Sequence, residues 1–366
     1  MTSPKSILVV SLRYYGDLLL TTPLIRAVAR GFEDAAVDVL ITEGTGAMLE
    51  GNPDVRSILT VSPRPSLAEH VALARRLWRR YDLAVIAETG DRPHLYGFFA
   101  APRRAGLLPQ RALARWWKRP LLERSAAFAT HERRIDAYRR LAEAMGVPFV
   151  AQAVPPTAGG TAEEWKAHLG LDADRDSYVV VNVAPRFRYK RWSVRGWCSL
   201  FEWLHARGMQ IVVSGGNAPE EREYVREVLA ESVVPAIDAG GRLGFGETAD
   251  LLRGAALYVG PDTATSHLAA ACGTPSVVLF GPTDPRLWGP IPRRGLATPY
   301  AAVAASQRRG NVLLLQEPSL SCVPCQHEGC ERHRESFSAC LDALPAASVI
   351  EAAKALLTRS GVSART

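Results

Sequence analysis

The sequence lacks several patterns that would assign it at once to a common functional class. No stretch approaches the ~20 uninterrupted apolar residues that span a bilayer. The beginning of the chain does not match a secretory signal, because Arg13 and Asp17 closely follow the short apolar run 7–10. No repeat of solenoid length is present either. We therefore expect a cytoplasmic protein whose contact with a membrane is at most peripheral.

Two glycine-rich cofactor motifs are also missing. The loop after the first expected strand has one glycine, Gly16, instead of the three of a dinucleotide fingerprint, which argues against a dehydrogenase. The run Gly240–Gly246 lacks the Gly-Lys-Ser/Thr ending of a nucleotide-binding P-loop and is better interpreted as a turn. Stable disulfides are not expected in a cytoplasmic chain, although it has six cysteines.

Length and pattern predict an α/β protein with two domains. The 366 residues exceed what one core usually serves, and strands alternate with helices as in doubly wound parallel sheets. We expect a Rossmann-like domain over 1–155, a Pro/Gly-rich linker near 154–160, and a second Rossmann-like domain over 156–345 facing the first across a cleft. The C-terminal segment 346–366 is predicted to be a helix that packs back on the first domain.

Positive charge is concentrated in one stretch. The whole chain has a net charge of +7, and residues 103–140 hold eleven Lys/Arg against three acids, a local balance of 11 − 3 = +8. This stretch is predicted to be helical, and Trp116 and Trp117 lie within it. Cations with interleaved aromatics are typical of surfaces for nucleic acid, acidic lipid or phosphorylated glycans. The alternative is a solvated face of ordinary helices.

Asp17 is the candidate catalytic residue of the first half. It follows Gly16 after the first strand, where a helix begins, and the helix dipole favours a carboxylate there. An ionised carboxylate at that position can take a proton from a sugar hydroxyl during attack on an electrophilic carbon. The alternative interpretation is a simple helix N-cap.

The most informative stretch of the second half is 257–290, which predicts a strand, a turn, a helix and another strand. In an open α/β sheet this strand-to-helix turn is where ligands bind, and free N–H groups at a helix start suit a phosphate or diphosphate. The alternative is that Asp262 and Thr263 merely cap the helix. The polar residues of the turn are Asp262, Thr263, Thr265, Ser266 and His267.

Two further groups follow strands of the second half. After the strand near 178–183, a group of cations could neutralise a diphosphate leaving group, with Lys190 as the main contact. The alternative is that these cations lie on a solvated loop and bind no ligand. After the strand near 211–214, Gly215 and Gly216 permit close approach of a nucleotide, and Glu220 or Glu221 could accept from ribose hydroxyls or merely cap a helix. The first group comprises Arg186, Arg188, Lys190, Arg191 and Trp192.

Four cysteines near the C-terminus permit a tetrahedral structural zinc site. The alternative is that they are buried thiols, or thiols that lie close in sequence without binding a metal. The spacing of the last two does not match a common zinc ribbon. No catalytic metal is expected. The four are Cys322, Cys325, Cys330 and Cys340.

The order and spacing of these motifs resemble the ADP-heptose:lipopolysaccharide heptosyltransferases, glycosyltransferase family 9, over nearly the whole chain. The motifs are ILVVSLRYYGDLLLTTPLIRAV at the start, NPDV at 52–55, RYKRW at 188–192, and VGPDTATSHLAAACGTPSVVLFGPTDPRLWGP. The closing CVPCQHEGC pattern is similar to that of the third-heptosyltransferase-like branch. The resemblance implies a GT-B architecture and inverting transfer from ADP-L-glycero-D-manno-heptose to the lipopolysaccharide inner core, without a catalytic metal.

The resemblance also implies residue roles. Asp17 matches the family's base, and Lys190 its phosphate-binding lysine. The diphosphate and sugar contacts match Asp262, Thr263, Ala264 and His267. Ala264 departs from the glycine common after the Asp-Thr pair. The bulky loop Arg13-Tyr14-Tyr15 before Gly16 should face the acceptor and leaves the acceptor's identity open.

Other interpretations remain open from the sequence. One is a glycosyltransferase that uses a different nucleotide sugar, and another is a non-catalytic protein that binds a nucleotide sugar or an anionic polymer. For the preferred interpretation the partners are an ADP-sugar, the lipopolysaccharide core and the inner membrane, and no nucleic acid is expected.

Overall fold

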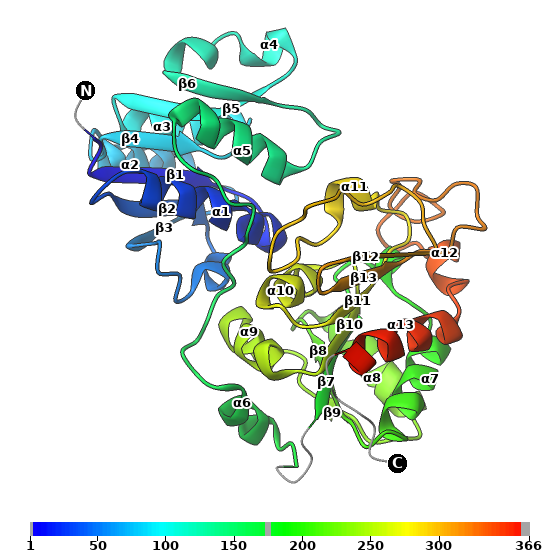
Figure 1. Ribbon diagram of the computed structural model, residues 1–366. Helices are drawn as coiled ribbons and strands as arrows, with labels where there is room; N and C mark the ends of the chain where they lie inside the picture. Colours follow the sequence, from blue (N-terminus) through cyan, green and yellow to red (C-terminus); the bar gives the residue numbers. More distant parts are fainter. Residues whose placement is uncertain (1–2, 173–176, 360–366) are drawn as a thin grey trace. The chain divides into compact units, whose positions relative to one another are not determined.

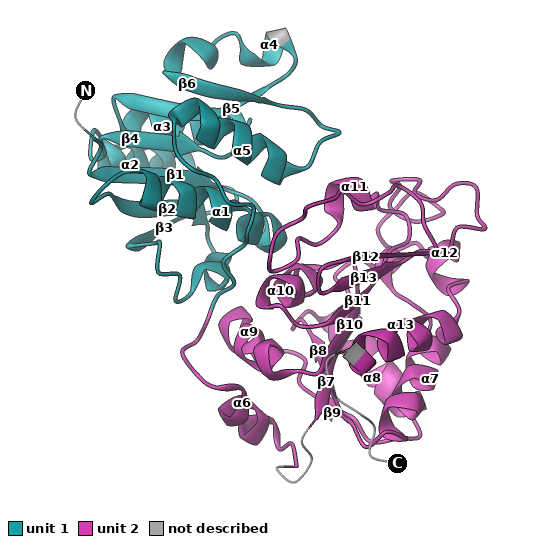
Figure 2. Ribbon diagram, in the orientation of Figure 1, with its two compact units in different colours: residues 1–156 teal, residues 157–366 magenta. Residues whose placement is uncertain are grey.

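The computed structural model describes residues 3–172 and 177–359, which form two compact units, Met1–Pro156 and Thr157–Thr366 (Figure 2). No helix among these residues has the length and apolar character needed to cross a membrane. Each unit is an α/β layered structure built on its own sheet (Figure 1).

Unit 1 has a six-stranded sheet in the order β3-β2-β1-β4-β5-β6, with every neighbouring pair parallel. This is the strand order of a Rossmann fold. The order reverses between β1 and β4, and in such sheets ligands bind outside the carboxyl ends of the strands at this switch point. The strands are β1 (Ser6–Ser11), β2 (Ala36–Thr42), β3 (Ser57–Val61), β4 (Leu83–Ile86), β5 (Arg103–Pro109) and β6 (Arg124–Phe128).

The central strands β1 and β4 are almost continuously apolar because helices cover both faces of a parallel sheet. The helix α1 buries one broad face, from Leu18 to Val28, and packs against α5. The helices and short 3₁₀ turns of unit 1 are α1 (Tyr15–Gly31), η1 (Gly46–Leu49), α2 (Leu67–Leu77), α3 (Asp91–Ala100), α4 (Ala112–Arg115), η2 (Arg119–Leu121) and α5 (Arg134–Met145).

The region 100–150 differs from the sequence-based expectation of a helical segment. It contributes two parallel strands, β5 and β6, in addition to α4 and α5. Arg103, Arg104 and Arg124 obscure the pattern because they lie at the start of these strands, where side chains reach solvent. Apolar residues such as Leu107 and Ala126 follow them into the core.

Unit 2 has a seven-stranded sheet in the order β12-β13-β11-β10-β7-β8-β9, which is parallel except for the β12–β13 pair. The chain proceeds from β7 to β8 and β9 on one side and returns to β10 on the other, so the switch point lies between β7 and β10. The strands are β7 (Tyr178–Ala184), β8 (Gln210–Gly215), β9 (Ile237–Asp238), β10 (Leu257–Pro261), β11 (Ser276–Leu279), β12 (Ser306–Arg309) and β13 (Val312–Leu315).

The helices of unit 2 follow these strands in alternation. They are α6 (Ala162–Leu169), η3 (Arg188–Lys190), α7 (Val194–His205), α8 (Pro219–Glu231), α9 (Phe245–Gly254), α10 (Ala264–Cys272), α11 (Pro285–Trp288), α12 (Ala339–Asp342) and α13 (Ala346–Arg359).

The helix α13 lies at the start of the segment that was predicted to pack on the first domain. It packs against α7, β10 and β11 of unit 2, and buries Val349, Ala353 and Leu356 in the same core as β7 and β8. The physical reason is its apolar face, which covers a part of the unit 2 sheet that is equally apolar. The last residues of the predicted segment, 360–366, lie outside the described residues.

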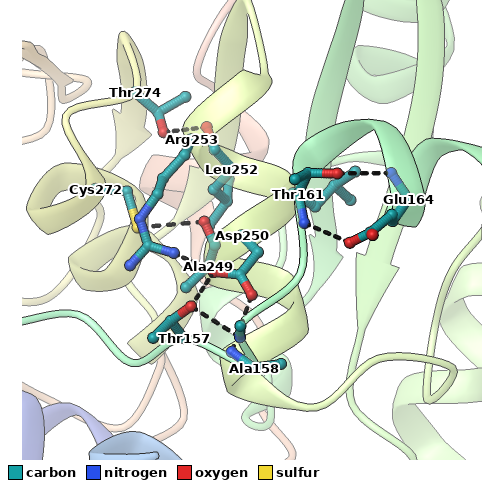
Figure 3. A network of polar contacts seen from close by, with 12 residues as sticks. Thr157, Ala158, Thr161, Glu164, Ala249, Asp250, Leu252, Arg253, Cys272 and Thr274 are labelled. Atoms are coloured by element: carbon teal, nitrogen blue, oxygen red, sulfur yellow. Dashed lines mark hydrogen bonds and ion pairs between the residues drawn. The ribbon is translucent and has the colours of Figure 1, made fainter. Parts of the chain in front are cut away.

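The start of unit 2 is fastened to α9 through Asp250 (Figure 3). The buried carboxylate of Asp250 accepts hydrogen bonds from the Thr157 hydroxyl at 2.7 Å and the Ala158 N–H at 2.9 Å, and pairs with Arg253. Thr161 and Glu164 form a reciprocal capping box that begins α6. The contacts of Asp250 hold the first residues of unit 2, directly after the linker, against α9.

Candidate functional site

The switch point of unit 2 brings together residues that follow two neighbouring strands. Lys190 lies in η3 after β7, and Asp262 follows β10. Because β7 and β10 are adjacent and parallel, their carboxyl ends meet at the same sheet edge. The structure therefore brings together the cation loop, residues 186–192, and the acidic turn that begins at Asp262.

Lys190 and Asp262 form a direct ion pair across this edge. The Lys190 ammonium lies 2.6 Å from Asp262 Oδ2 and also donates to the Asp262 carbonyl oxygen at 3.2 Å. The lysine side chain is 18% exposed and the aspartate 8%, so the pair is mostly shielded from water. An ammonium has three N–H donors, and these two contacts leave one for an oxygen of a ligand.

The turn after β10 starts the helix α10 with an ordered cap. The Thr263 hydroxyl accepts from the Ser266 N–H at 3.4 Å, so Thr263 is the N-cap. The Ser266 hydroxyl, fully buried, contacts the Tyr258 hydroxyl at 2.9 Å and holds the turn onto β10. Ala264 is the first helical residue, where alanine is well tolerated, and His267 is buried one turn further along. Capping thus accounts for Thr263, whereas Asp262 pairs with Lys190.

Asn182 is a residue of this edge that the sequence interpretation missed. It is the single polar residue within the buried strand β7, and its amide donates to the Thr265 hydroxyl at 3.3 Å. Among the described residues its Oδ1 atom is buried without a hydrogen-bond partner. A polar side chain in the run VVVNVA was the available signal.

The loop after β8 places Glu221, and not Glu220, beside Gly216. A Cβ atom added to Gly216 would meet the carboxylate of Glu221, so the glycine makes room for this side chain. Glu221 also accepts a long hydrogen bond, 3.4 Å, from the Ala218 N–H at the start of α8. Burial raises the pKa of the Glu221 carboxyl above its ordinary value. The side chain of Glu220 is exposed.

The other members of the cation loop have different environments. Arg186 and Arg188 are exposed, and Arg191 stacks over Tyr224 at 4.4 Å and donates to the Glu220 carbonyl. Trp192 is buried against Trp197 and donates to the Leu344 carbonyl at 2.9 Å, which makes it a core residue. Lys190 is thus the member of this loop that is ion-paired with Asp262.

At the switch point of unit 1, Asp17 is held by two arginines. It lies in the first turn of α1, 10% exposed, and its two oxygens lie 3.2 Å from Arg13 Nε and 3.2 Å from Arg134 Nε. The N-cap of α1 is Tyr14, which makes no side-chain cap. The N-cap interpretation of Asp17 is therefore wrong. Its carboxylate is oriented by ion pairs with the loop before it and with α5.

Arg134 and Glu88 complete this cluster and were not predicted. Arg134, at the start of α5, is 11% exposed and its guanidinium lies 4.8 Å from the ring centre of Phe128. Glu88 follows β4 and accepts from the Leu12 N–H at the end of β1. Burial raises the pKa of the Glu88 carboxyl, and the neighbouring Asp17 acts in the same direction. Two carboxylates and two guanidiniums therefore share one partly buried site.

The loop predicted to face an acceptor lies directly before this cluster. Tyr14 is 70% exposed, and Arg13, 38% exposed, forms the ion pair to Asp17 described above. The hydroxyl of Tyr15 donates to the Gly44 carbonyl at 2.9 Å and fixes the loop to the chain after β2. Gly16 lies in the first turn of α1. An exposed aromatic beside an oriented carboxylate is suited to a sugar ring.

Comparison with known proteins identifies the family. The model of glycosyltransferase family 9 (heptosyltransferase) matches residues 70–312. The chain belongs to glycosyltransferase family 9. The resemblance drawn from the motifs is thereby confirmed.

Two proteins similar to this family 9 chain match it over nearly its whole length. It is 25% identical over 362 residues to lipopolysaccharide heptosyltransferase 3 of Escherichia coli K12, covering 96% of this chain and 98% of that protein. It resembles the crystal structure of a family 9 glycosyl transferase from Veillonella parvula with a TM-score of 0.76 at 20% identity, covering 97% of both chains.

The E. coli ADP-heptose lps heptosyltransferase II is also similar to this chain, with a TM-score of 0.74 at 19% identity, covering 97% of this chain and 99% of that one. These likenesses confirm the predicted GT-B architecture of two Rossmann-like units.

The four C-terminal cysteines of the family 9 chain are free thiols. Cys330 Sγ accepts from the Ala339 N–H at 3.4 Å, and burial raises the pKa of Cys340 to about 12. Within 3–172 and 177–359, no group of three or more His, Cys, Asp or Glu residues is placed to hold a metal ion. The structural zinc site stays a prediction.

Proposed function

We propose that this chain is an inverting glycosyltransferase that moves a heptose from ADP-L-glycero-D-manno-heptose to the lipopolysaccharide inner core. Support comes from membership of family 9 and from relatives named as lipopolysaccharide heptosyltransferases. The observation that carries the proposal is the Lys190–Asp262 pair at the switch point of unit 2, beside the start of α10.

On the donor side, Lys190 and the N-terminal end of α10 bind the diphosphate. The bond between the anomeric carbon and the phosphate oxygen breaks, and its electron pair leaves on ADP. The third N–H of Lys190 and the free backbone N–H groups after Thr263 stabilise that charge. Asp262 keeps the ammonium in place and can accept from a sugar hydroxyl, and His267 lies on the next turn. Glu221 accepts from the ribose because its carboxylate lies beside Gly216.

On the acceptor side, Asp17 is the general base. It takes the proton of the acceptor hydroxyl as that oxygen attacks the anomeric carbon from the face opposite the leaving ADP, which inverts the configuration. Arg13 and Arg134 orient the carboxylate, and Tyr14 and Gly16 belong to the loop that meets the acceptor. No metal has a role in this scheme.

The acceptor is proposed to be a core lipid held at the inner face of the cytoplasmic membrane, which the enzyme contacts peripherally from the cytoplasm. Nucleic acid is not a proposed partner. Two relatives are named lipopolysaccharide heptosyltransferase 3, which favours transfer of the third heptose.

A donor screen tests this function. Purified protein is given a heptose-deficient core acceptor with ADP-heptose, ADP-glucose or UDP-glucose, and the acceptor is analysed by mass spectrometry. We expect a mass increase with ADP-heptose alone. Transfer from a UDP-sugar would assign a different donor, and ADP-heptose binding without any product would favour a non-catalytic nucleotide-sugar-binding protein. The core oligosaccharide of a deletion strain should lack the heptose that this enzyme adds.

A further inference from the structure

The connection between β5 and β6 exposes two large apolar side chains. It comprises residues 110–122, with α4 and η2 (Figure 1). Leu113 is 89% exposed, more than any other large hydrophobic residue among those described, and Trp116 is 72% exposed. Both lie within four residues of chain. Single exposed apolar residues are ordinary, but a Leu and a Trp on one short loop indicate a surface that contacts something.

This connection is firmly attached to the rest of unit 1. Lys118, which is buried, donates to the Thr89 carbonyl at 2.7 Å and lies 2.7 Å from Asp91 Oδ1. Trp117 contacts His94 edge-on, with ring centres 6.3 Å apart. Leu122 at the end is buried against β4 and β5. The connection therefore presents Leu113 and Trp116 from an ordered base.

The same connection carries several exposed positive charges. Arg111, Arg115 and Arg119 are all exposed, and the segment 110–122 contains no acidic residue. The fourth cation, Lys118, is neutralised by Asp91. The connection thus combines two exposed apolar side chains, one of them a tryptophan, with three exposed arginines. This composition is typical of segments that lie in the interface of an anionic membrane.

Other partners fit this composition less well. A nucleic acid offers phosphates to the arginines but no apolar layer for Leu113. A symmetric contact between two copies of the chain would bring the arginines of one copy close to those of the other. An anionic bilayer offers both a negative surface and an apolar interior at the right depth.

We propose that the β5–β6 connection docks this enzyme on an anionic lipid bilayer. Leu113 and Trp116 insert at the boundary between headgroups and acyl chains, and Arg111, Arg115 and Arg119 contact lipid phosphates. The inference rests on the proposed function, because it gives the surface through which the enzyme reaches an acceptor held in a membrane.

The test is co-sedimentation of the full chain with vesicles of phosphatidylglycerol or of phosphatidylcholine, without donor or acceptor. Wild type should bind phosphatidylglycerol and be released by salt, because exposed charges are screened. Leu113→Glu with Trp116→Glu should lower this binding at least about tenfold, as expected when two apolar side chains are lost from the bilayer. Arg111→Glu with Arg115→Glu should lower it to a similar extent.

The matched control is Leu67→Glu with Trp78→Glu, an exposed Leu and Trp elsewhere in unit 1, at 79% and 58% exposure. The control should bind vesicles as wild type does. Equal loss in the control, or no loss in the Leu113/Trp116 variant, would overturn the proposal. So would wild-type self-association that this variant abolishes, or binding of a short DNA as tight as that of phosphatidylglycerol.

Turnover separates this inference from the proposed function. The Leu113/Trp116 variant should keep wild-type heptose transfer to a core oligosaccharide without lipid, and lose transfer to the same core held in phosphatidylglycerol vesicles. If wild type transfers nothing yet binds the vesicles through Leu113 and Trp116, the docking surface stands and the proposed function fails. If wild type transfers heptose but the Leu113/Trp116 variant binds vesicles normally, the proposed function stands and the docking surface fails.

Discussion

Replacing Lys190 by Ala tests the leaving-group assignment most closely. The Lys190 ammonium makes two contacts with Asp262 and has one N–H left for a phosphate oxygen. A hydrogen bond to a charged group contributes about 1.5–3 kcal/mol. Because 1.4 kcal/mol corresponds to tenfold in affinity, Lys190→Ala should weaken ADP binding about 10- to 100-fold.

Lys190→Ala should also lower the free energy of unfolding, and this effect must be separated from the effect on ADP binding. Asp262 is 8% exposed, and without Lys190 its carboxylate keeps no ammonium partner, which should cost ~1–3 kcal/mol of unfolding free energy. Adding Asp262→Asn removes the uncompensated charge. The double variant should therefore recover part of the lost stability while its affinity for ADP stays low.

Isothermal titration calorimetry with ADP, together with chemical denaturation, provides the measurement. Lys354→Ala, which removes an exposed lysine on α13, is the matched control and should change neither quantity. Unchanged ADP affinity in Lys190→Ala would refute the assignment of this lysine to the diphosphate.

Three further predictions concern the remaining site residues. Asp17→Asn should lower heptose transfer about 10²–10⁴-fold while ADP affinity is kept, and full activity would remove Asp17 from the base role. Thr263→Ala should reduce the unfolding free energy by about 1 kcal/mol because α10 loses its N-cap, as measured by denaturation. The pKa of Glu88 is raised in the folded state, so the fold holds this proton to a higher pH than the unfolded chain, and the Glu88 contribution to stability falls as pH rises above 4.5. Glu88→Gln should remove that decline, and an unchanged pH profile of unfolding would contradict the assignment.

The Lys190–Asp262 site of unit 2 was predictable because its residues follow strands that the sequence indicates clearly. Lys190 and Asp262 are 72 residues apart. Asp262 comes directly after the apolar strand β10, and Lys190 lies in η3, in the loop that follows the apolar strand β7. The carboxyl ends of parallel strands share one edge of a sheet. What the sequence could not provide was the adjacency of β7 and β10, which converts two separate candidates into an ion pair.

The cluster around Asp17 was predictable only in part. Asp17 stands out after β1, but Arg134 is one of eleven cations in a basic stretch, and Glu88 is one acid after a four-residue strand. Their meeting depends on α5 packing on α1, where the Tyr138 and Thr21 hydroxyls lie 3.0 Å apart. Tertiary packing of this kind leaves no local pattern.

The parts of the fold that the sequence did not predict have the same origin. The strands β5 and β6 carry arginines at their starts, which masks their apolar remainder, and α13 has an apolar face that does not identify which core it covers. In both cases local propensity was consistent with more than one arrangement, and packing selected one.

In the proposed reaction, release of ADP is coupled to transfer of a heptose. The most direct measurement is the amount of ADP and of heptosylated core formed when purified protein, in excess, is mixed with ADP-heptose and a heptose-deficient core. We expect equal amounts of both products, with the configuration at the anomeric carbon inverted. ADP released without heptosylated core, or product of retained configuration, would contradict it.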